Sequence, residues 1–125
     1  MDKRHLKRTR TIQQLFALSF GGTSSKNLGE SEHAAKDIVK NKKKIDSVIQ
    51  KYVLRYPLEK IAKIDLAILR LAIYELLYER KNPTSVVIDE AVELAKEFGS
   101  ERSFSFINGV LAGVARNELQ HQQKN

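Results

Sequence analysis

Hydrophobic residues recur along most of the chain at steps of three and four, which is the spacing of helices with one buried face. Alternation of β-branched and polar residues is nearly absent, so strands are not expected. Glycine, serine and polar residues over 21–31 predict a loop, and the polar end of the chain predicts a frayed tail. The pattern predicts helices over about 3–20, 31 to 53 with a break near Asn41, 64–79, 84–98 and 100–114. The sequence therefore predicts an all-α fold.

The segment from Ile64 to Glu79 is apolar on nearly every side. A helix without a polar face belongs in the centre of a domain. Asp65, Arg70 and Glu75 interrupt the segment, and at about 100° per residue they point in different directions. Each of them needs a partner, because an unpaired buried charge is costly.

Small and polar residues mark the expected ends and contacts of the last two helices. Thr84 or Ser85 can cap one helix, and Ser100 can cap the next. Gly109 and Gly113 lower helix propensity by roughly 1 kcal/mol each. We expect close approach of a neighbouring helix or a ligand to compensate for them.

Composition narrows the class of protein. A chain of 125 residues fits one compact domain, and the absence of cysteine excludes disulfides and thiolate metal sites. No apolar run reaches the roughly 18 residues that span a bilayer, and no secretory signal follows the basic N-terminus. We expect a soluble, cytoplasmic protein that does not act on a membrane.

The residues that carry catalysis or bind metals are not arranged for either task. His5, His33 and His121 lack ligand spacing, and nucleotide-binding, hydrolase and metalloprotease motifs are absent. Asp89 and Glu93 are four residues apart, a spacing common on any solvated helix face. The sequence predicts no catalytic site, no metal site and no cofactor.

Positive charge is concentrated on the first helix. The formal net charge of the chain is +7, and the first ten residues carry five basic side chains: Lys3, Arg4, Lys7, Arg8 and Arg10. These side chains occupy an arc of roughly 160°, and an apolar face that includes Phe16 follows them. Arginine-rich helices of this kind bind RNA, although a solvated charged terminus is the alternative. A second lysine cluster, over 40–44, is more typical of a solvated helix end.

Three segments together resemble the NusB family of bacterial transcription antitermination factors. The first is the basic helix leading into Gln13-Gln14-Leu15-Phe16. The second runs from Pro57-Leu58-Glu59-Lys60-Ile61 to Ile73-Tyr74-Glu75-Leu76. The third runs from Pro83-Thr84 through Val87-Ile88-Asp89-Glu90-Ala91 to Phe106-Ile107-Asn108-Gly109-Val110-Leu111.

This resemblance implies two small helical bundles packed together, with about six or seven helices in one RNA-binding domain. The subdomains would cover about 1–56 and 57–118, with a frayed tail over 119–125. It also implies pairing with NusE, a small-subunit ribosomal protein, and binding of the boxA element in nascent ribosomal RNA. The complex would join RNA polymerase and suppress premature termination, without catalysis or a cofactor. A homodimer that hides the RNA-binding face is a possible free state.

The resemblance also implies roles for individual residues. Lys3, Arg4, Lys7 and Arg8 would contact RNA, and Arg10 belongs to the same basic surface. Phe16 and Glu75 would face NusE, with a core aromatic and an internally paired acid as the alternatives.

Two departures from the family pattern affect these expectations. Ala112 stands where many relatives carry an acid near the RNA, and the stretch 21–50 looks short. A contact made from either place is therefore in doubt.

Two other functions fit the sequence. One is a NusB-like RNA-binding module of an rRNA cytosine methyltransferase, although nothing after Asn117 supplies a cofactor-binding domain. The other is a scaffold that binds only protein and uses its basic surface for solubility.

Overall fold

The computed structural model describes residues 2–20 and 30–119, and all regular structure within these ranges is helical. The elements in chain order are α1 (Lys3–Leu18), α2 (Glu30–Lys40), α3 (Lys42–Tyr52), the 3-10 turn η1 (Leu58–Lys60), α4 (Lys63–Tyr74), the π-turn η2 (Glu75–Glu79), α5 (Thr84–Phe98), α6 (Ser103–Val114) and the π-turn η3 (Ala115–Leu119). The all-α prediction and the break near Asn41 are confirmed. Residues 30 and 31 of the loop predicted over 21–31 belong to α2, and Leu119 of the frayed tail predicted over 119–125 belongs to η3. The rest of both segments, 21–29 and 120–125, lies outside the described residues.

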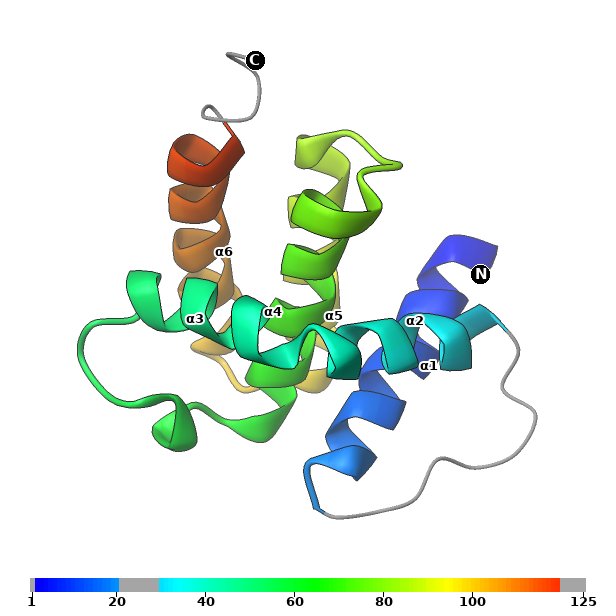
Figure 1. Cartoon of the computed structure of the whole chain (residues 1–125), viewed down its shortest axis with the longest axis horizontal. Coiled ribbons are helices and arrows are strands. Elements are labelled where there is room, and N and C mark those ends of the chain that lie inside the picture. The colour runs from blue at the N-terminus through cyan, green and yellow to red at the C-terminus, as the bar shows by residue number, and fades with distance from the viewer. Residues whose placement is uncertain (1, 21–29, 120–125) are drawn as a thin grey trace.

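Helix α4 occupies the centre of the molecule (Figure 1). It contacts α1, α2, α3, α5 and α6, while α2 and α3 cross the front of the view and α1 lies at its right. One hydrophobic cluster includes residues from all six α-helices. On α4, Ile68, Leu69 and Ile73 are at most 1% exposed. Burial of each such side chain stabilises the fold by about 1.5–3 kcal/mol, so an apolar α4 holds both halves of the chain together.

Two of the three charged residues inside the central segment have a hydrogen-bonded partner, as expected. Arg70 donates two hydrogen bonds to Asp46 of α3, at 2.8 and 2.9 Å. Glu75 pairs with α1, as described below. Asp65 meets this expectation less fully, because its Oδ1 is buried without a hydrogen-bond partner. Burial raises the pKa of Asp65 because the charged carboxylate loses solvation there.

Side-chain hydrogen bonds fix the connection between α3 and η1. The amide of Gln50 donates to the carbonyl oxygens of Val53 (2.8 Å) and Tyr56 (3.2 Å). Its Oε1 accepts the backbone N–H of Leu58 at 2.8 Å. One side chain therefore satisfies three backbone groups that no helix supplies with partners.

The predicted helix caps are wrong. Thr84 is already the first residue of α5, which begins after Pro83 without a side-chain cap. Helix α6 begins at Ser103, because a turn holds the preceding residues: the backbone N–H of Ser100 donates to Ser103 Oγ at 2.9 Å. A Cβ atom on Gly99 would lie 2.5 Å from the Ser103 side chain, so this close turn requires glycine.

The two glycines of α6 have different surroundings. A Cβ atom on Gly113 would lie 3.0 Å from the ring of Tyr52, so α3 approaches α6 closely at this position. A Cβ atom on Gly109 would meet nothing within 4 Å. The expected close approach of a helix is thus found at Gly113 and not at Gly109.

Candidate nucleic-acid interface

Helix α1 presents its basic residues along a well-formed first turn. The Asp2 side chain accepts the backbone N–H of Arg4 at 2.9 Å, which caps the helix. Lys3, Arg4 and Arg10 are exposed, and Lys7 is half-buried. The predicted basic surface therefore exists, with four of its five residues reaching solvent to some extent.

The fifth basic residue, Arg8, faces inward. Its Nε and one terminal nitrogen donate to the two carboxylate oxygens of Glu75 at 2.9 and 2.8 Å. The two residues are only 6% and 5% exposed. This paired geometry and the Glu75 charge raise the pKa of Arg8, so the guanidinium stays charged. Sequence reasoning placed Arg8 on RNA and Glu75 on NusE, whereas the structure brings the two together, and either contact would require this pair to open.

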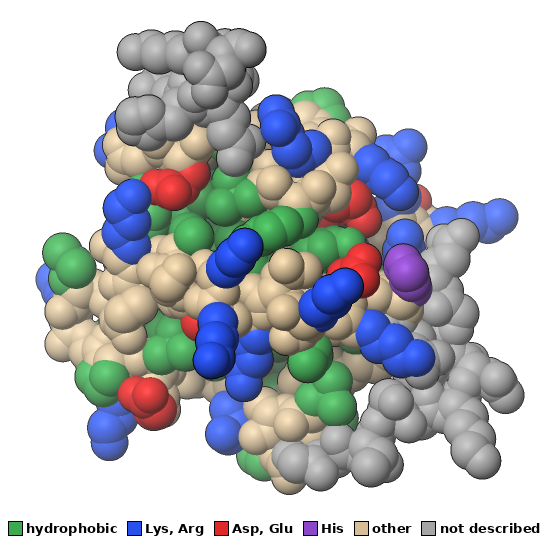
Figure 2. Space-filling model, in the orientation of Figure 1, with side chains coloured by type: hydrophobic (Ala, Val, Ile, Leu, Met, Phe, Trp, Pro, Cys, Tyr) green, Lys and Arg blue, Asp and Glu red, His purple; other side chains and the backbone are tan. Residues whose placement is uncertain are grey.

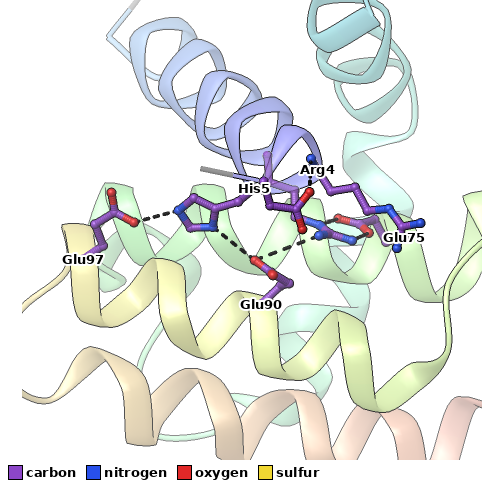
Figure 3. A network of polar contacts seen from close by, with 7 residues as sticks. Arg4, His5, Glu75, Glu90 and Glu97 are labelled. Carbon is purple, nitrogen blue, oxygen red and sulfur yellow. Dashed lines mark hydrogen bonds and ion pairs between the residues drawn. The ribbon is translucent and has the colours of Figure 1, made fainter.

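A second set of side-chain contacts joins the N-terminal half of α1 to α5. His5 Nδ1 lies 3.2 Å from Glu90 Oε2, and its Nε2 lies 2.9 Å from Glu97 Oε2 (Figure 3). A carboxylate only accepts hydrogen bonds, so both contacts are hydrogen bonds when both ring nitrogens carry protons. The two carboxylates, Glu90 first, accordingly raise the pKa of His5.

Sequence reasoning assigned His5 no role beyond its lack of metal-ligand spacing, so this contact was missed. The available signal was the spacing of Glu90 and Glu97, seven residues apart and hence on one face of α5. That spacing does not reveal which helix packs against the acids. Glu90 and Glu97 of α5 thus hold α1 in place.

Phe16 lies at the other end of α1 and is 37% exposed. Its ring packs edge-on against Phe20, with centroids 4.9 Å apart. The ammonium group of Lys63 lies 5.0 Å from the centroid of the Phe20 ring. We call these three residues the aromatic patch; it leaves an apolar surface open at the C-terminal end of α1.

The second lysine cluster lies where α2 meets α3. Lys40, Lys42, Lys43 and Lys44 are all exposed there. Figure 2 shows Lys and Arg side chains spread over the face that α2 and α3 present. This cluster is separate in sequence from the basic residues of α1, and it offers a charge-matched comparison for them.

The described residues give no sign of a metal site or a membrane span. Across 2–20 and 30–119, no group of three or more His, Cys, Asp or Glu side chains is placed to hold an ion. No described helix is both long enough and apolar enough to cross a bilayer.

Sequence comparison finds many similar proteins. A relative from Bacillus pumilus, "Transcription antitermination protein NusB", is 34% identical over 96% of this chain and 99% of its own length. A protein of the same name from Caldicellulosiruptor saccharolyticus is 45% identical over 68% of this chain. That match covers 65% of the relative, somewhat less than two thirds of its length.

Structural comparison gives the same picture. T. maritima NusB superposes with a TM-score of 0.83, at 30% identity, over 93% of this chain and 92% of that one. A chain from a crystal structure of "Antitermination Factors NusB and NusE in complex with dsRNA" shares the fold with a TM-score of 0.68 at 19% identity, over 92% of this chain and 98% of that one. The model of the NusB family matches residues 2–116. With nearly the whole chain matched in sequence and in fold, this protein belongs to the NusB family.

Proposed function

We propose that this protein is an RNA-binding transcription antitermination factor that acts in the cytoplasm together with NusE. It binds the boxA element of nascent ribosomal RNA and joins the RNA polymerase complex, without catalysis or a cofactor. The observation that carries the proposal is the basic surface of α1: Lys3, Arg4 and Arg10 are exposed on a helix that the core holds in one orientation. Fixed basic side chains on one helix suit the regularly spaced phosphates of RNA.

The family supports the same function. The curated relatives carry the name transcription antitermination protein. A solved structure with the same fold contains NusB, NusE and double-stranded RNA. Neither comparison assigns a role to a residue of this chain, so the residue roles rest on geometry.

The geometry suggests a division of roles along α1. Lys3, Arg4, Lys7 and Arg10 contact RNA, while Arg8 acts indirectly by holding the helix against Glu75. The aromatic patch around Phe16 offers NusE an apolar surface at the other end of the same helix. Glu75 influences both surfaces through Arg8.

A fluorescence titration tests the function directly. Labelled boxA RNA and a scrambled RNA of equal length are titrated with the protein, with and without NusE. We expect NusE to make binding tight and selective for boxA. Equal affinity for the two RNAs in the presence of NusE would refute the proposal.

A charge-reversal variant tests the role of α1. We expect Lys3→Glu combined with Arg4→Glu and Arg10→Glu to abolish selective binding. The salt dependence of the remaining binding should weaken by a slope of about 2, since each phosphate contact to a single strand contributes about 0.7.

The control reverses three charges at the second lysine cluster, with Lys42→Glu, Lys43→Glu and Lys44→Glu. We expect it to retain selectivity for boxA. Intact selective RNA binding by the α1 variant would show that α1 does not make the RNA contact. Absence of RNA binding by the wild type would favour a protein-only scaffold, and a methyltransferase domain in the same reading frame would favour the RNA-modification module.

A further inference from the structure

A hollow of about 340 Å³ lies between the N-terminal half of α1, Ala34 of α2 and the end of α4 with η2. The residues that precede α5 complete its lining. Its volume is near the lower end of the roughly 300–1,000 Å³ typical of small-molecule sites. The hollow can therefore take a single small group but not a helix or a strand. Its lining includes the basic side chains Arg4, Lys7 and Lys81.

The lining combines three kinds of chemistry. Arg4 and Lys81 are exposed, which places these cations at the mouth. Ala34 and Leu71 are buried and give the inner wall an apolar surface. The carboxylate of Glu79 adds a hydrogen-bond acceptor. A phosphate ion alone would use only the cations of this set.

A nucleotide would use all three kinds of group. Its phosphate suits a guanidinium and an ammonium group, and its base has flat apolar faces and amino groups that donate hydrogen bonds. Proteins that recognise single-stranded RNA commonly hold splayed-out bases through contacts to their flat faces and hydrogen bonds to their edges. Arg4 belongs both to the hollow and to the exposed basic surface of α1, so a strand lying along α1 would pass the mouth.

We propose that this hollow binds one unstacked nucleotide of the RNA, with the phosphate between Arg4 and Lys81 and the base against Ala34 and Leu71. The proposal rests on the proposed function, because it assumes that RNA lies along α1. It assigns to the residues before α5 a direct contact with RNA that the basic pattern of α1 alone does not indicate.

A buried salt bridge forms part of the inner wall of the hollow and holds the side chains there in one position. Arg8 and Glu75 both line it and hold each other through two hydrogen bonds. The Tyr74 hydroxyl donates to Asp37 at 3.0 Å, and burial together with this carboxylate raises the pKa of Tyr74 to about 12. The inner side is therefore formed before RNA arrives, which lowers the cost of ordering on binding.

Substitution of Lys81 tests the mouth of the hollow. We expect Lys81→Glu to weaken boxA binding in the presence of NusE about tenfold or more, since a charge-assisted contact is lost and a repulsion is added. The matched control is Arg80→Glu, which reverses the neighbouring exposed charge outside the lining. Equal losses from the two variants would overturn the proposal, because they would indicate general electrostatics alone.

Filling the hollow tests the base. In wild type, replacing one nucleotide of boxA by an abasic nucleotide, one position at a time, should reveal a position where affinity falls about tenfold. Ala34→Met should lower affinity for intact RNA by a similar factor and make that same abasic replacement harmless. Thermal melting checks that the variant folds, and Lys81→Glu tests the hollow if it does not.

The outcomes separate this proposal from the function itself. Selective boxA binding by wild type, with every abasic position affecting wild type and Ala34→Met alike, would overturn the nucleotide site and leave the function standing. Absence of selective binding by wild type would refute both. Weaker binding of NusE by Lys81→Glu without RNA would assign the hollow to the protein partner and would also overturn the proposal.

Discussion

Removing one partner of the buried pair between Arg8 and Glu75 should lower the free energy of unfolding. Glu75→Gln leaves the Arg8 guanidinium, 6% exposed, without its carboxylate. Breaking such a buried pair costs about 3–5 kcal/mol. Glu90 lies 3.9 Å from Arg8 and offsets part of the loss, so we expect the lower end, about 3 kcal/mol. For a chain of this length the melting temperature should fall by roughly 10 °C.

Urea unfolding followed by circular dichroism measures this effect. The matched control is Glu93→Gln, the same chemical change at an exposed ion pair with Lys96, and it should alter stability by less than about 0.5 kcal/mol. The double variant Arg8→Met with Glu75→Leu should lose less than Glu75→Gln alone, because no charge is left buried without a partner. A loss within about 0.5 kcal/mol for Glu75→Gln, or a double variant worse than the single one, would refute the reasoning.

Four further predictions concern stability. The pKa of His5 is raised, so its stabilising contribution should be full below about pH 6.5 and lost as pH rises through the raised value. The urea midpoint of His5→Gln should therefore differ less between pH 6 and pH 8 than that of the wild type. An equal difference in the two proteins would contradict this prediction. Gly109→Ala should stabilise the protein by about 0.8–1.0 kcal/mol, because α6 gains helix propensity and open space surrounds the new methyl group. Gly113→Ala should gain less than Gly109→Ala or lose stability, because the ring of Tyr52 must move; a larger gain at Gly113 by thermal melting would count against the packing argument. Asp65→Asn should raise the urea midpoint at pH 7, because burial raises the pKa of the carboxyl and disfavours its charged form. The difference in midpoint between variant and wild type should shrink toward about pH 4. A lower midpoint for the variant at pH 7 would show that the interaction with Ser103 stabilises the carboxylate by more than burial costs it.

The helices could be predicted from the sequence because each buries one face or, for α4, all faces. Periodicity located α1 and α4 well, with α1 ending at Leu18 rather than near residue 20. Helix starts were predicted less well, because a serine or threonine can cap a helix only if the preceding turn places it correctly. At α6 the turn after Gly99 uses Ser103 instead of Ser100.

The candidate site was predicted in composition but not in orientation. The basic pattern of α1 identified the right helix, but it could not separate Arg8, which points inward, from its exposed neighbours. The partner of Arg8 lies 67 residues away in the chain, and periodicity on α1 carries no information about α4. Lys81 could not be predicted either, because it lines the same hollow as Arg4 of α1 only once the folded chain brings these distant residues together.

The charged and polar residues of the central segment have an evolutionary consequence. Arg70 pairs with Asp46 of α3 and Glu75 pairs with Arg8 of α1, so two neighbours of the central segment are held by side chains of opposite charge. An apolar α4 alone would accept its neighbours in several rotations, whereas these contacts favour one arrangement. Among members of the family, we therefore expect positions 8 and 75 to change together, as should positions 46 and 70. A lineage that loses one member of a pair should lose or replace the other.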